Sequence, residues 1–452
     1  MKKQRLKMST THIILASFLA AIMIGALLLC LPISSADGEP TPFIDALFTA
    51  TTSTCVTGLV VAPTVSSWSV FGQAVILLLI QIGGLGVITI MSAVMITLHK
   101  KMGIGDRLLL QDAFNLNSLS GLIKFVKKVV LGTFIVEGVG ALLYMTVFVP
   151  EFGARGIWVS VFTSVSAFCN AGIDIIAENS LCDYALNPMI NIVTCALIIL
   201  GGIGYIVWWD VIRLAREARH RRVKFFRDLT LGSKIAIAAT LVLIFVGAGL
   251  IFAFEYDNPL TMRDCTLWEK LEMSFFQSVT TRTAGFATIP QENLTNASSV
   301  ICLLLMFIGG SPVGTAGGVK TVTFVIILAT AFASILGKDD TELFGRRITK
   351  ETVTKAVAVT SMSFIIMFLS TVLLSAVTDA GSLDVMYETV SATATVGLTR
   401  NLTPSLNLYG KMIIILTMYL GRVGPISLAL AFKSGKENEN IVKNPTEEIS
   451  VG

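Results

Sequence analysis

The sequence predicts an all-α polytopic membrane protein, and three observations carry that prediction. Of its 452 residues, 54% are hydrophobic and 14% are charged, whereas ordinary soluble domains carry about 25% charged residues. Apolar stretches of about 20 residues, the length that crosses the ~30 Å hydrocarbon core of a bilayer, recur along the chain. A fixed order of segments also occurs four times, which predicts four pseudo-repeats of M1–pore helix–M2, in which a short helix lies between two spans.

Eight full-length spans follow from the apolar stretches. They cover residues 12–31, 72–98, 125–149, 188–212, 231–254, 299–336, 356–377 and 408–432, and the sixth is interrupted. The first apolar run is too long for the core of a typical signal peptide, so we expect this span to be retained. The predicted organisation is an N-terminal segment 1–11, repeats 12–98, 125–212, 231–336 and 356–432, and a tail 433–452.

Basic residues predict the orientation of the chain. Segments 1–11, 99–128, 213–234, 338–355 and 433–452 hold 4, 6, 8, 5 and 3 Lys or Arg residues, most of the 34 in the chain. Loops rich in Lys and Arg stay on the cytosolic side of a membrane. Both termini are therefore expected to be cytosolic, in a multi-pass protein of the plasma membrane.

Each loop after an odd-numbered span contains an amphipathic segment that is too short to cross the bilayer. These segments, 42–53, 156–168, 267–280 and 382–393, are typical of half-helices that enter from outside, and a glycine-containing turn follows each one. The matching residues, called the four turns below, are Val56, Thr57 and Gly58; Asn170, Ala171 and Gly172; Thr283, Ala284 and Gly285; and Thr395, Val396 and Gly397. A second glycine mark, such as "IGGLG" at 82–86, recurs in the span after each turn.

Irregular backbone at membrane depth must line a wet cavity. Four such turns predict a central pore, whose backbone carbonyls replace the water around a dehydrated cation. The fourth turn, 395–397, also matches the first three residues of TVGYG, the filter motif of potassium channels. Potassium at this selectivity filter is the only metal ion predicted. The alternative is a set of re-entrant loops around the substrate cavity of a coupled secondary transporter.

Residues 309–320 of the sixth span, the glycine-rich loop, are expected not to be helical. The members of this loop that matter are Gly309, Gly310, Ser311, Pro312, Val313, Gly314, Thr315, Ala316, Gly317, Gly318 and Lys320. Each Gly costs a helix about 1 kcal/mol relative to Ala, and Pro about 3 kcal/mol. Because unpaired backbone is too costly against lipid, the loop is expected to face the pore below the four turns. A static kink for helix packing is the alternative.

Arg422 and Glu137 are two of the charged residues inside the predicted spans. Arg422 stands at the second glycine mark of the last span, where the other repeats have Gly84, Gly202 and Gly310. A guanidinium below the turns would repel cations and donate to loop carbonyls, and the alternative is snorkelling to the cytosolic interface. Glu137 is expected to make a structural hydrogen bond to a neighbouring helix or turn, with a proton relay as the alternative.

These motifs together resemble the Trk/Ktr/HKT superfamily of potassium transporters over nearly the whole chain. Eight spans without an additional N-terminal pair are most like its KtrB-type bacterial membrane subunits. The resemblance implies potassium uptake across the bacterial plasma membrane, a homodimer of two separate pores, and a cytosolic ring of KtrA-like RCK subunits that binds ATP or ADP. It also implies that the glycine-rich loop is an intramembrane gate, and that Arg422 forms the constriction with it.

The resemblance also bears on the ion and on the partners. In plant relatives a Ser in the first turn accompanies sodium transport, so Gly58 favours potassium; sodium or mixed transport, or sodium as an activator, is the alternative. The sequence has no G-x-G-x-x-G after a strand and no P-loop, so nucleotide is expected on the partner ring and not on this chain. Basic loops could dock that ring, with Arg221 and Arg222 as candidate contacts.

Other classes of function are not indicated by the sequence. It has no nucleophile–base set and no metal-ligand cluster that would indicate an enzyme. Membrane lipid is an expected partner and nucleic acid is not. Whether Cys182 and Cys265, both in outer loops, form a disulfide stays open.

Overall fold

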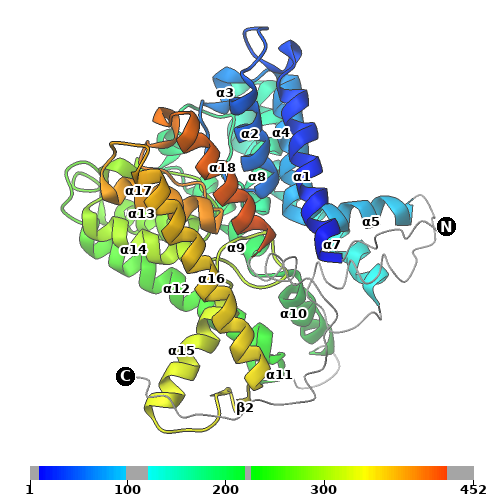
Figure 1. Ribbon diagram of the computed structural model, residues 1–452, viewed down its shortest axis with the longest axis vertical. Helices are drawn as coiled ribbons and strands as arrows, with labels where there is room; N and C mark the ends of the chain where they lie inside the picture. Colours follow the sequence, from blue (N-terminus) through cyan, green and yellow to red (C-terminus); the bar gives the residue numbers. More distant parts are fainter. Residues whose placement is uncertain (1–9, 98–120, 219–224, 425–452) are drawn as a thin grey trace, which may run out of the picture.

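The computed structural model describes residues 10–97, 121–218 and 225–424 (Figure 1). Within these ranges the chain forms seventeen α-helices and one short hairpin, in which β1 (Glu342–Leu343) pairs with β2 (Arg346–Arg347). Four of these helices are long and apolar enough to cross a membrane: α1 (Thr10–Leu29), α7 (Leu122–Phe152), α12 (Leu231–Glu255) and α16 (Lys350–Ser375). They occupy the positions predicted for the first span of each repeat.

A shorter helix follows each long one, where the sequence predicts it. These helices are α2 (Phe43–Cys55), α8 (Arg155–Cys169), α13 (Leu267–Thr280) and α17 (Ser382–Ala394). They are rich in Ser and Thr, yet their C-terminal halves are buried. Hydroxyl groups there donate back to the helix, as Ser53 does to the Thr49 carbonyl. The helices α2, α8 and α17 each end at a residue in the left-handed conformation, respectively Val56, Asn170 and Thr395.

A glycine on the long helix admits the short helix at close range. In the second repeat a Cβ on Gly140 would lie 2.5 Å from Ser164 Oγ, and in the third a Cβ on Gly247 would lie 2.5 Å from Ser278 Oγ. Each serine donates to a long-helix carbonyl three residues before that glycine, at 2.6 and 2.8 Å. The same glycine–serine contact in two repeats indicates that they share one local packing.

A third helix completes each repeat. These helices are α4 (Val70–Leu85), α9 (Pro188–Gly202), α14 (Asn296–Phe307) and α18 (Leu408–Val423). Each starts after a residue whose side chain accepts a backbone N–H of the first helical turn. The four capping residues are Ser69, Asn187, Thr295 and Asn407. Such caps stabilise a helix by about 1 kcal/mol, and here they fix where the chain re-enters the bundle.

The structure corrects the expectation of continuous spans at 72–98 and 188–212. The first is broken at Gly86 (φ +86°) and the second at Gly204 (φ +92°), where the axis bends by 98°. The helices beyond the breaks are α5 (Val87–Thr97), α10 (Tyr205–Glu217) and, after the glycine-rich loop, α15 (Thr321–Ile335). Helix α18 likewise stops at Gly424 (φ +86°). A positive φ takes these glycines out of the helical region, so a helix ends at or next to the second glycine mark in every repeat.

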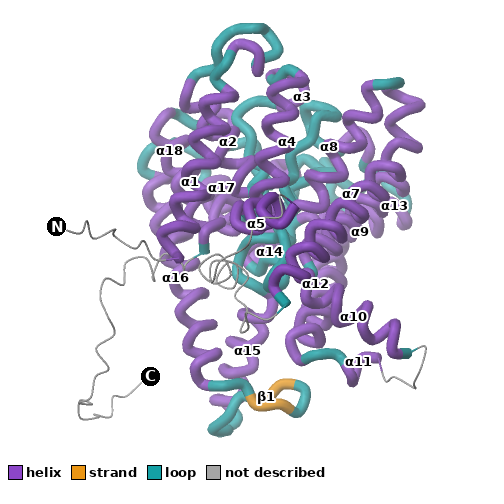
Figure 2. The backbone as a smooth tube through the Cα atoms, turned by 90° about the vertical axis from the view of Figure 1, so that its right-hand side faces the viewer, coloured by secondary structure: helices purple, strands orange, loops and turns teal. Residues whose placement is uncertain are grey.

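The remaining helical elements are short. They are α3 (Thr64–Ser67), α11 (Phe225–Asp228), and the 3-10 turns η1 (Pro32–Ser34), η2 (Cys182–Tyr184), η3 (Gln291–Asn293) and η4 (Thr403–Ser405). Figure 2 shows α10, α11, α15 and the hairpin gathered at one end, away from α3 and the upper loops. The predicted contacts Arg221 and Arg222, the tail 433–452, and parts of the predicted N-terminal segment and basic loops lie outside the described residues.

Contacts between the last and the first repeat close the bundle. Lys411 Nζ of α18 lies 2.5 Å from Asp45 Oδ1 of α2, and the Tyr419 hydroxyl donates to the Leu15 carbonyl at 3.0 Å. Helices from opposite ends of the sequence, blue and red in Figure 1, therefore lie side by side.

Candidate functional site: an ion pathway

The four turns meet in one ring in the centre of the bundle. A Cβ on Gly58 would lie 2.3 Å from the Ala171 carbonyl oxygen, and one on Gly172 would lie 2.4 Å from that of Ala284. The series continues from Gly285 to the Val396 oxygen (2.4 Å) and from Gly397 to the Thr57 oxygen (2.3 Å). Each glycine thus faces the carbonyl that precedes the glycine of the next repeat, and the fourth repeat returns to the first.

The backbone of the turns alternates between unusual and ordinary conformations. The residues two before each glycine, Val56, Asn170, Thr283 and Thr395, have φ of 56°, 60°, 66° and 52°. The glycines have φ between 64° and 97°. Positive φ at alternate residues turns successive carbonyl groups toward the same side of the chain, which is the arrangement that a carbonyl-lined cation site needs.

Hydroxyl groups of the short helices hold the turns in place. Thr52 Oγ1 accepts the Gly58 N–H and Ser391 Oγ accepts the Gly397 N–H, both at 3.0 Å. In the third repeat Thr280 Oγ1 donates to the Phe286 carbonyl at 2.6 Å. Our sequence reasoning missed these supports. A Ser or Thr five or six residues before each turn glycine was the signal that could have found them.

The glycine-rich loop has a closed neck and a body that rests on another repeat. At the neck, Ile308 and Val319 form a parallel bridge. In the body, the N–H groups of Ser311 and Thr315 donate to carbonyls of Gly202 and Gly201, at 2.8 and 3.1 Å. The Tyr205 N–H at the start of α10 donates to the Val313 carbonyl at 2.9 Å. The loop therefore docks on the bend between α9 and α10.

The loop also contacts residues at three of the turns. The Thr315 hydroxyl lies 3.0 Å from the Phe168 carbonyl oxygen and 3.1 Å from Asn170 Oδ1. The Gly317 N–H donates to Thr283 Oγ1 at 3.2 Å, and a Cβ on Gly317 would lie 2.0 Å from Thr395 Oγ1. The predicted proximity of loop and turns is therefore present.

The two predicted charged residues at the loop both bind backbone carbonyls. Arg422 donates through Nη1 to the Thr315 carbonyl at 2.7 Å and through Nη2 to the Gly83 carbonyl. Lys320 Nζ donates to the Ala316 carbonyl at 2.5 Å. The Arg422 guanidinium is thus held between the loop and α4, which argues against a side chain that snorkels away from both.

Glu137 makes the structural contacts expected of it. Gln81 of α4 donates to its carboxylate at 3.3 Å, and the Cys169 thiol at the end of α8 lies 3.7 Å from the other oxygen. The acid therefore joins three helices beside the second turn. Cys182 and Cys265 are both free thiols in the structure.

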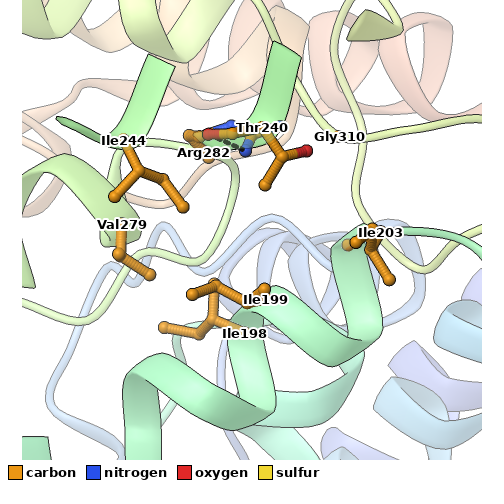
Figure 3. Close-up of a pocket in the computed structure, with 9 residues that line it drawn as sticks. Ile198, Ile199, Ile203, Thr240, Ile244, Val279, Arg282 and Gly310 are labelled. Atoms are coloured by element: carbon orange, nitrogen blue, oxygen red, sulfur yellow. Dashed lines mark hydrogen bonds between the residues drawn. The ribbon is translucent and has the colours of Figure 1, made fainter. Parts of the chain in front are cut away.

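Arg282 is a buried charged residue that our sequence reasoning missed. It directly precedes Thr283 in the third turn, is 7% exposed, and forms no ion pair with any described residue. Its guanidinium lies 3.5 Å from the Thr240 carbonyl oxygen and 3.3 Å from that of Gly309. Figure 3 shows it beside Thr240, over a cavity of about 10 Å³ that Ile198 also lines. Arg282 thus ties the start of the glycine-rich loop to α12.

Long apolar helices around a buried ring of polar backbone are the mark of an integral membrane transport protein. Residues 1–444 match the TrkH family, which is described as cation transport protein. The chain belongs to this family, and the resemblance predicted from its motifs is confirmed.

Two curated relatives match over nearly their full length. The potassium/sodium uptake protein NtpJ of Enterococcus hirae is 39% identical, over 100% of this chain and 99% of its own. The Ktr system potassium uptake protein B of Bacillus subtilis is also 39% identical, over 98% and 96% of the two chains. The crystal structure of the potassium transporter TrkH from Vibrio parahaemolyticus shares the fold, with a TM-score of 0.75 over 96% of this chain and 86% of that chain at 15% identity.

Proposed function

We propose that this protein takes up potassium across the bacterial plasma membrane through a selectivity filter built from the four turns. The observation that carries the proposal is the closed series of contacts in which each turn glycine faces a carbonyl of the next repeat. A ring of carbonyl oxygens can replace the hydration shell of potassium. The short helices end at this ring, so their partly negative C-termini favour a cation there.

The proposed path through the membrane has four repeats, each crossing twice, with both termini in the cytosol. Support comes from the four long apolar helices and the four capped helices that follow the turns. In this orientation the membrane potential draws potassium inward, since the filter entrance faces outside.

The glycine-rich loop with Arg422 is the proposed gate of this path. Its support is the position of the loop directly at the inner ends of the turns, with Arg422 bound to the Thr315 carbonyl. A cation leaving the filter would meet a backbone segment and a guanidinium at this point. The Lys320 side chain lies in the same arrangement and donates a hydrogen bond to the Ala316 carbonyl.

The proposed assembly is a homodimer of two separate pores that binds a cytosolic ring of KtrA-like RCK subunits. A relative is named as a protein of the "Ktr system", which supports a system of several components. Nucleotide would bind to the ring, and potassium is the substrate of the filter and not a resident cofactor.

Growth at limiting potassium tests the proposal. A bacterial strain that lacks its own potassium transporters, and expresses this chain with a KtrA-like subunit, should grow at potassium concentrations at which the vector control does not. A Gly285→Ser variant present in the membrane at equal amount is the matched control. If strains with the wild-type chain grow no better than those with the vector, potassium uptake is the wrong assignment.

Sodium or mixed sodium and potassium transport is the second candidate. The observation in its favour is that a relative at 39% identity is named a potassium/sodium uptake protein. Competition of rubidium tracer uptake by added Na⁺ or K⁺ separates the two: a potassium-selective filter is blocked by K⁺ at much lower concentration than by Na⁺.

A coupled secondary transporter has less support. The buried carboxylates Glu255 and Glu388 are bonded to neighbouring hydroxyls or amides, and Glu137 to Gln81. Among the described residues, none of these three acids forms a hydrogen bond with another acid.

A further inference from the structure

Loop and turns meet through a specific pattern of donors and acceptors. The loop supplies the donors, the Thr315 O–H and the Gly317 N–H. The inner end of the pathway supplies oxygen acceptors, which are the Phe168 carbonyl, Asn170 Oδ1 and Thr283 Oγ1. The loop therefore forms specific hydrogen bonds, in which its O–H and N–H groups donate to oxygen atoms at the turns.

Those acceptors have the chemistry of cation ligands. Carbonyl, amide and hydroxyl oxygens are the groups that coordinate dehydrated monovalent cations in filters. They come from the second and third repeats, and Thr395 Oγ1 of the fourth lies against Gly317, buried and without a hydrogen-bond partner. An unpaired buried hydroxyl is costly, and its oxygen is free to accept. The first repeat contributes only the apolar Val56 at this level.

We infer that the glycine-rich loop closes the path by occupying the innermost cation site, so that the docked loop and an ion at that site exclude each other. The inference rests on the proposed filter and names how that filter is regulated. Thr315 and Gly317 stand in for the cation while the loop is docked, and Asn170, Thr283 and Thr395 become ion ligands when it withdraws. Cations that reach the inner site then hold the loop away.

The coupling must work in both directions. If docking of the loop weakens ion binding by a certain factor, then a bound ion weakens docking of the loop by the same factor. One hydrogen bond contributes a net stabilisation that corresponds to about a fivefold change in an equilibrium. Loss of the Thr315 donor should therefore raise the undocked population about fivefold, and should lower the potassium concentration at which the path opens.

Tracer flux through the full-length protein tests this. The protein is reconstituted in liposomes, and rubidium exchange is measured in symmetric KCl at several concentrations, with choline chloride keeping ionic strength constant. For wild type, the exchange rate per available ion should rise with KCl. Thr315→Val should raise the exchange at low KCl about fivefold and flatten that rise, whereas Thr315→Ser, which keeps the donor, should match wild type.

Gly317→Ala provides an independent variant. Its Cβ would lie 2.0 Å from Thr395 Oγ1 and 2.5 Å from the Ala394 carbonyl oxygen, so the loop cannot dock there. Exchange should be high at every KCl concentration. Size-exclusion chromatography checks that each variant remains folded.

Two outcomes overturn the inference. One is that Thr315→Val and Thr315→Ser show the same exchange, and the other is that the wild-type exchange rate per ion does not change with KCl concentration. The preference for rubidium over sodium is read in the same vesicles. A wild-type protein without that preference contradicts the filter itself. A preserved preference with no effect of the Thr315 variants contradicts only the competition between loop and ion.

Discussion

At the four turns the chain holds residues in a backbone conformation that they rarely adopt. Val56, Thr283 and Thr395 are β-branched and yet have positive φ. Such residues cost about 1–3 kcal/mol each and persist only where their surroundings determine them. Here the hydroxyls of Thr52 and Ser391 bind the turn backbone. The strain lies at the residues of the proposed filter.

Serine in place of Gly58 or Gly285 should weaken potassium uptake. The added Cβ would lie 2.3 Å from the Ala171 oxygen or 2.4 Å from the Val396 oxygen, at positive φ in both cases. We expect the apparent affinity for potassium to fall about tenfold or more, with a smaller effect on sodium. Rubidium uptake kinetics in cells measure this. Gly138→Ser, where a Cβ meets nothing within 4 Å, is the control, and unchanged kinetics in both filter variants would remove the assignment.

Asp174 should make the stability of the protein depend on pH. It lies in the loop between α8 and α9, two residues after Gly172, and burial raises its pKa to about 6 from an ordinary 3.8. The folded state therefore binds this proton more tightly than the unfolded state. Stability contributed by the protonated acid is present below about pH 4 and is lost as the pH rises through about 6.

Asp174→Asn should remove the loss of stability that occurs as the pH rises. The variant keeps a side-chain oxygen for the Ile176 N–H but has no charge to bury. Its Tm in detergent should resemble that of the wild type near pH 4 and exceed it at pH 7. At pH 7 the gain in the free energy of unfolding should be about 2–3 kcal/mol at most. Asp264→Asn, at an exposed acid, is the control. Equal wild-type and Asp174→Asn profiles from pH 4 to 7 would contradict the expectation.

At the scale of elements, the glycine-rich loop is built in two parts. Its neck is closed by the Ile308–Val319 bridge and by Arg282 on the Gly309 carbonyl. Its body is bound to the bend between α9 and α10 and to Arg422. The five glycines of the loop lower the cost of moving its body about the neck, so we expect its position to depend on a few hydrogen bonds.

Removing residues 313–317 should leave the path open. The deletion takes away the contacts to Tyr205 and Asn170 while the neck residues stay. Ion flux in vesicles should be high and should not respond to ATP or ADP on a bound KtrA-like ring. Arg422→Ala should raise flux in the same direction but less, because the loop backbone still obstructs the path. A folded, dimeric deletion variant with nucleotide-controlled flux would show that the loop is not the gate.

At the scale of the whole molecule, polar side chains join neighbouring repeats. Lys411 to Asp45 joins the fourth repeat to the first across 366 residues of sequence. Arg400 bonds Asp384 of its own repeat and the Ser299 hydroxyl of the third. Asp45, Ser299, Asp384 and Lys411 all lie in the first turn of their helices.

The Lys411–Asp45 pair should contribute measurably to stability. Its side chains are 17% and 28% exposed, whereas those of the pair Lys355–Glu351 are 65% and 77% exposed. A double-mutant cycle with Lys411→Met and Asp45→Asn should give a coupling of about 1 kcal/mol. The same cycle on Lys355 and Glu351 should give close to zero. Thermal unfolding followed by circular dichroism measures both, and equal couplings would contradict a special role for ring closure.

A cytosolic partner ring should depend on the basic end of the molecule. Arg346 is an exposed residue of the hairpin, and the hairpin lies at the same end of the molecule as α10 and α11 (Figure 2). Arg346→Glu should weaken co-purification with a KtrA-like ring, because it reverses charge on the proposed cytosolic face. Arg263→Glu, at an exposed position of the opposite loops, should not. If both variants bind the ring equally well, the charge on the hairpin contributes only to the orientation of the chain in the membrane.

Sequence by itself determined the parts of this protein. Hydropathy located the long helices, and short amphipathic segments followed by glycine located α2, α8, α13 and α17 and their turns. The run of breakers at 309–320 predicted a non-helical loop, and the position of Arg422 predicted its contact with that loop. These features could be predicted because apolar length, helical period and the conformational effects of Gly and Pro act within a few turns of chain.

Tertiary structure alone decided how the parts meet. The sequence does not distinguish a glycine that an apolar helix tolerates from one that breaks the helix. Gly204 breaks its span at the point where the loop docks on Tyr205. The order of the ring, the contact of Arg282 with Gly309, and that of Thr315 with Asn170 across 145 residues leave no local pattern. They arise because buried carbonyls and guanidiniums must find partners wherever the packed bundle provides them.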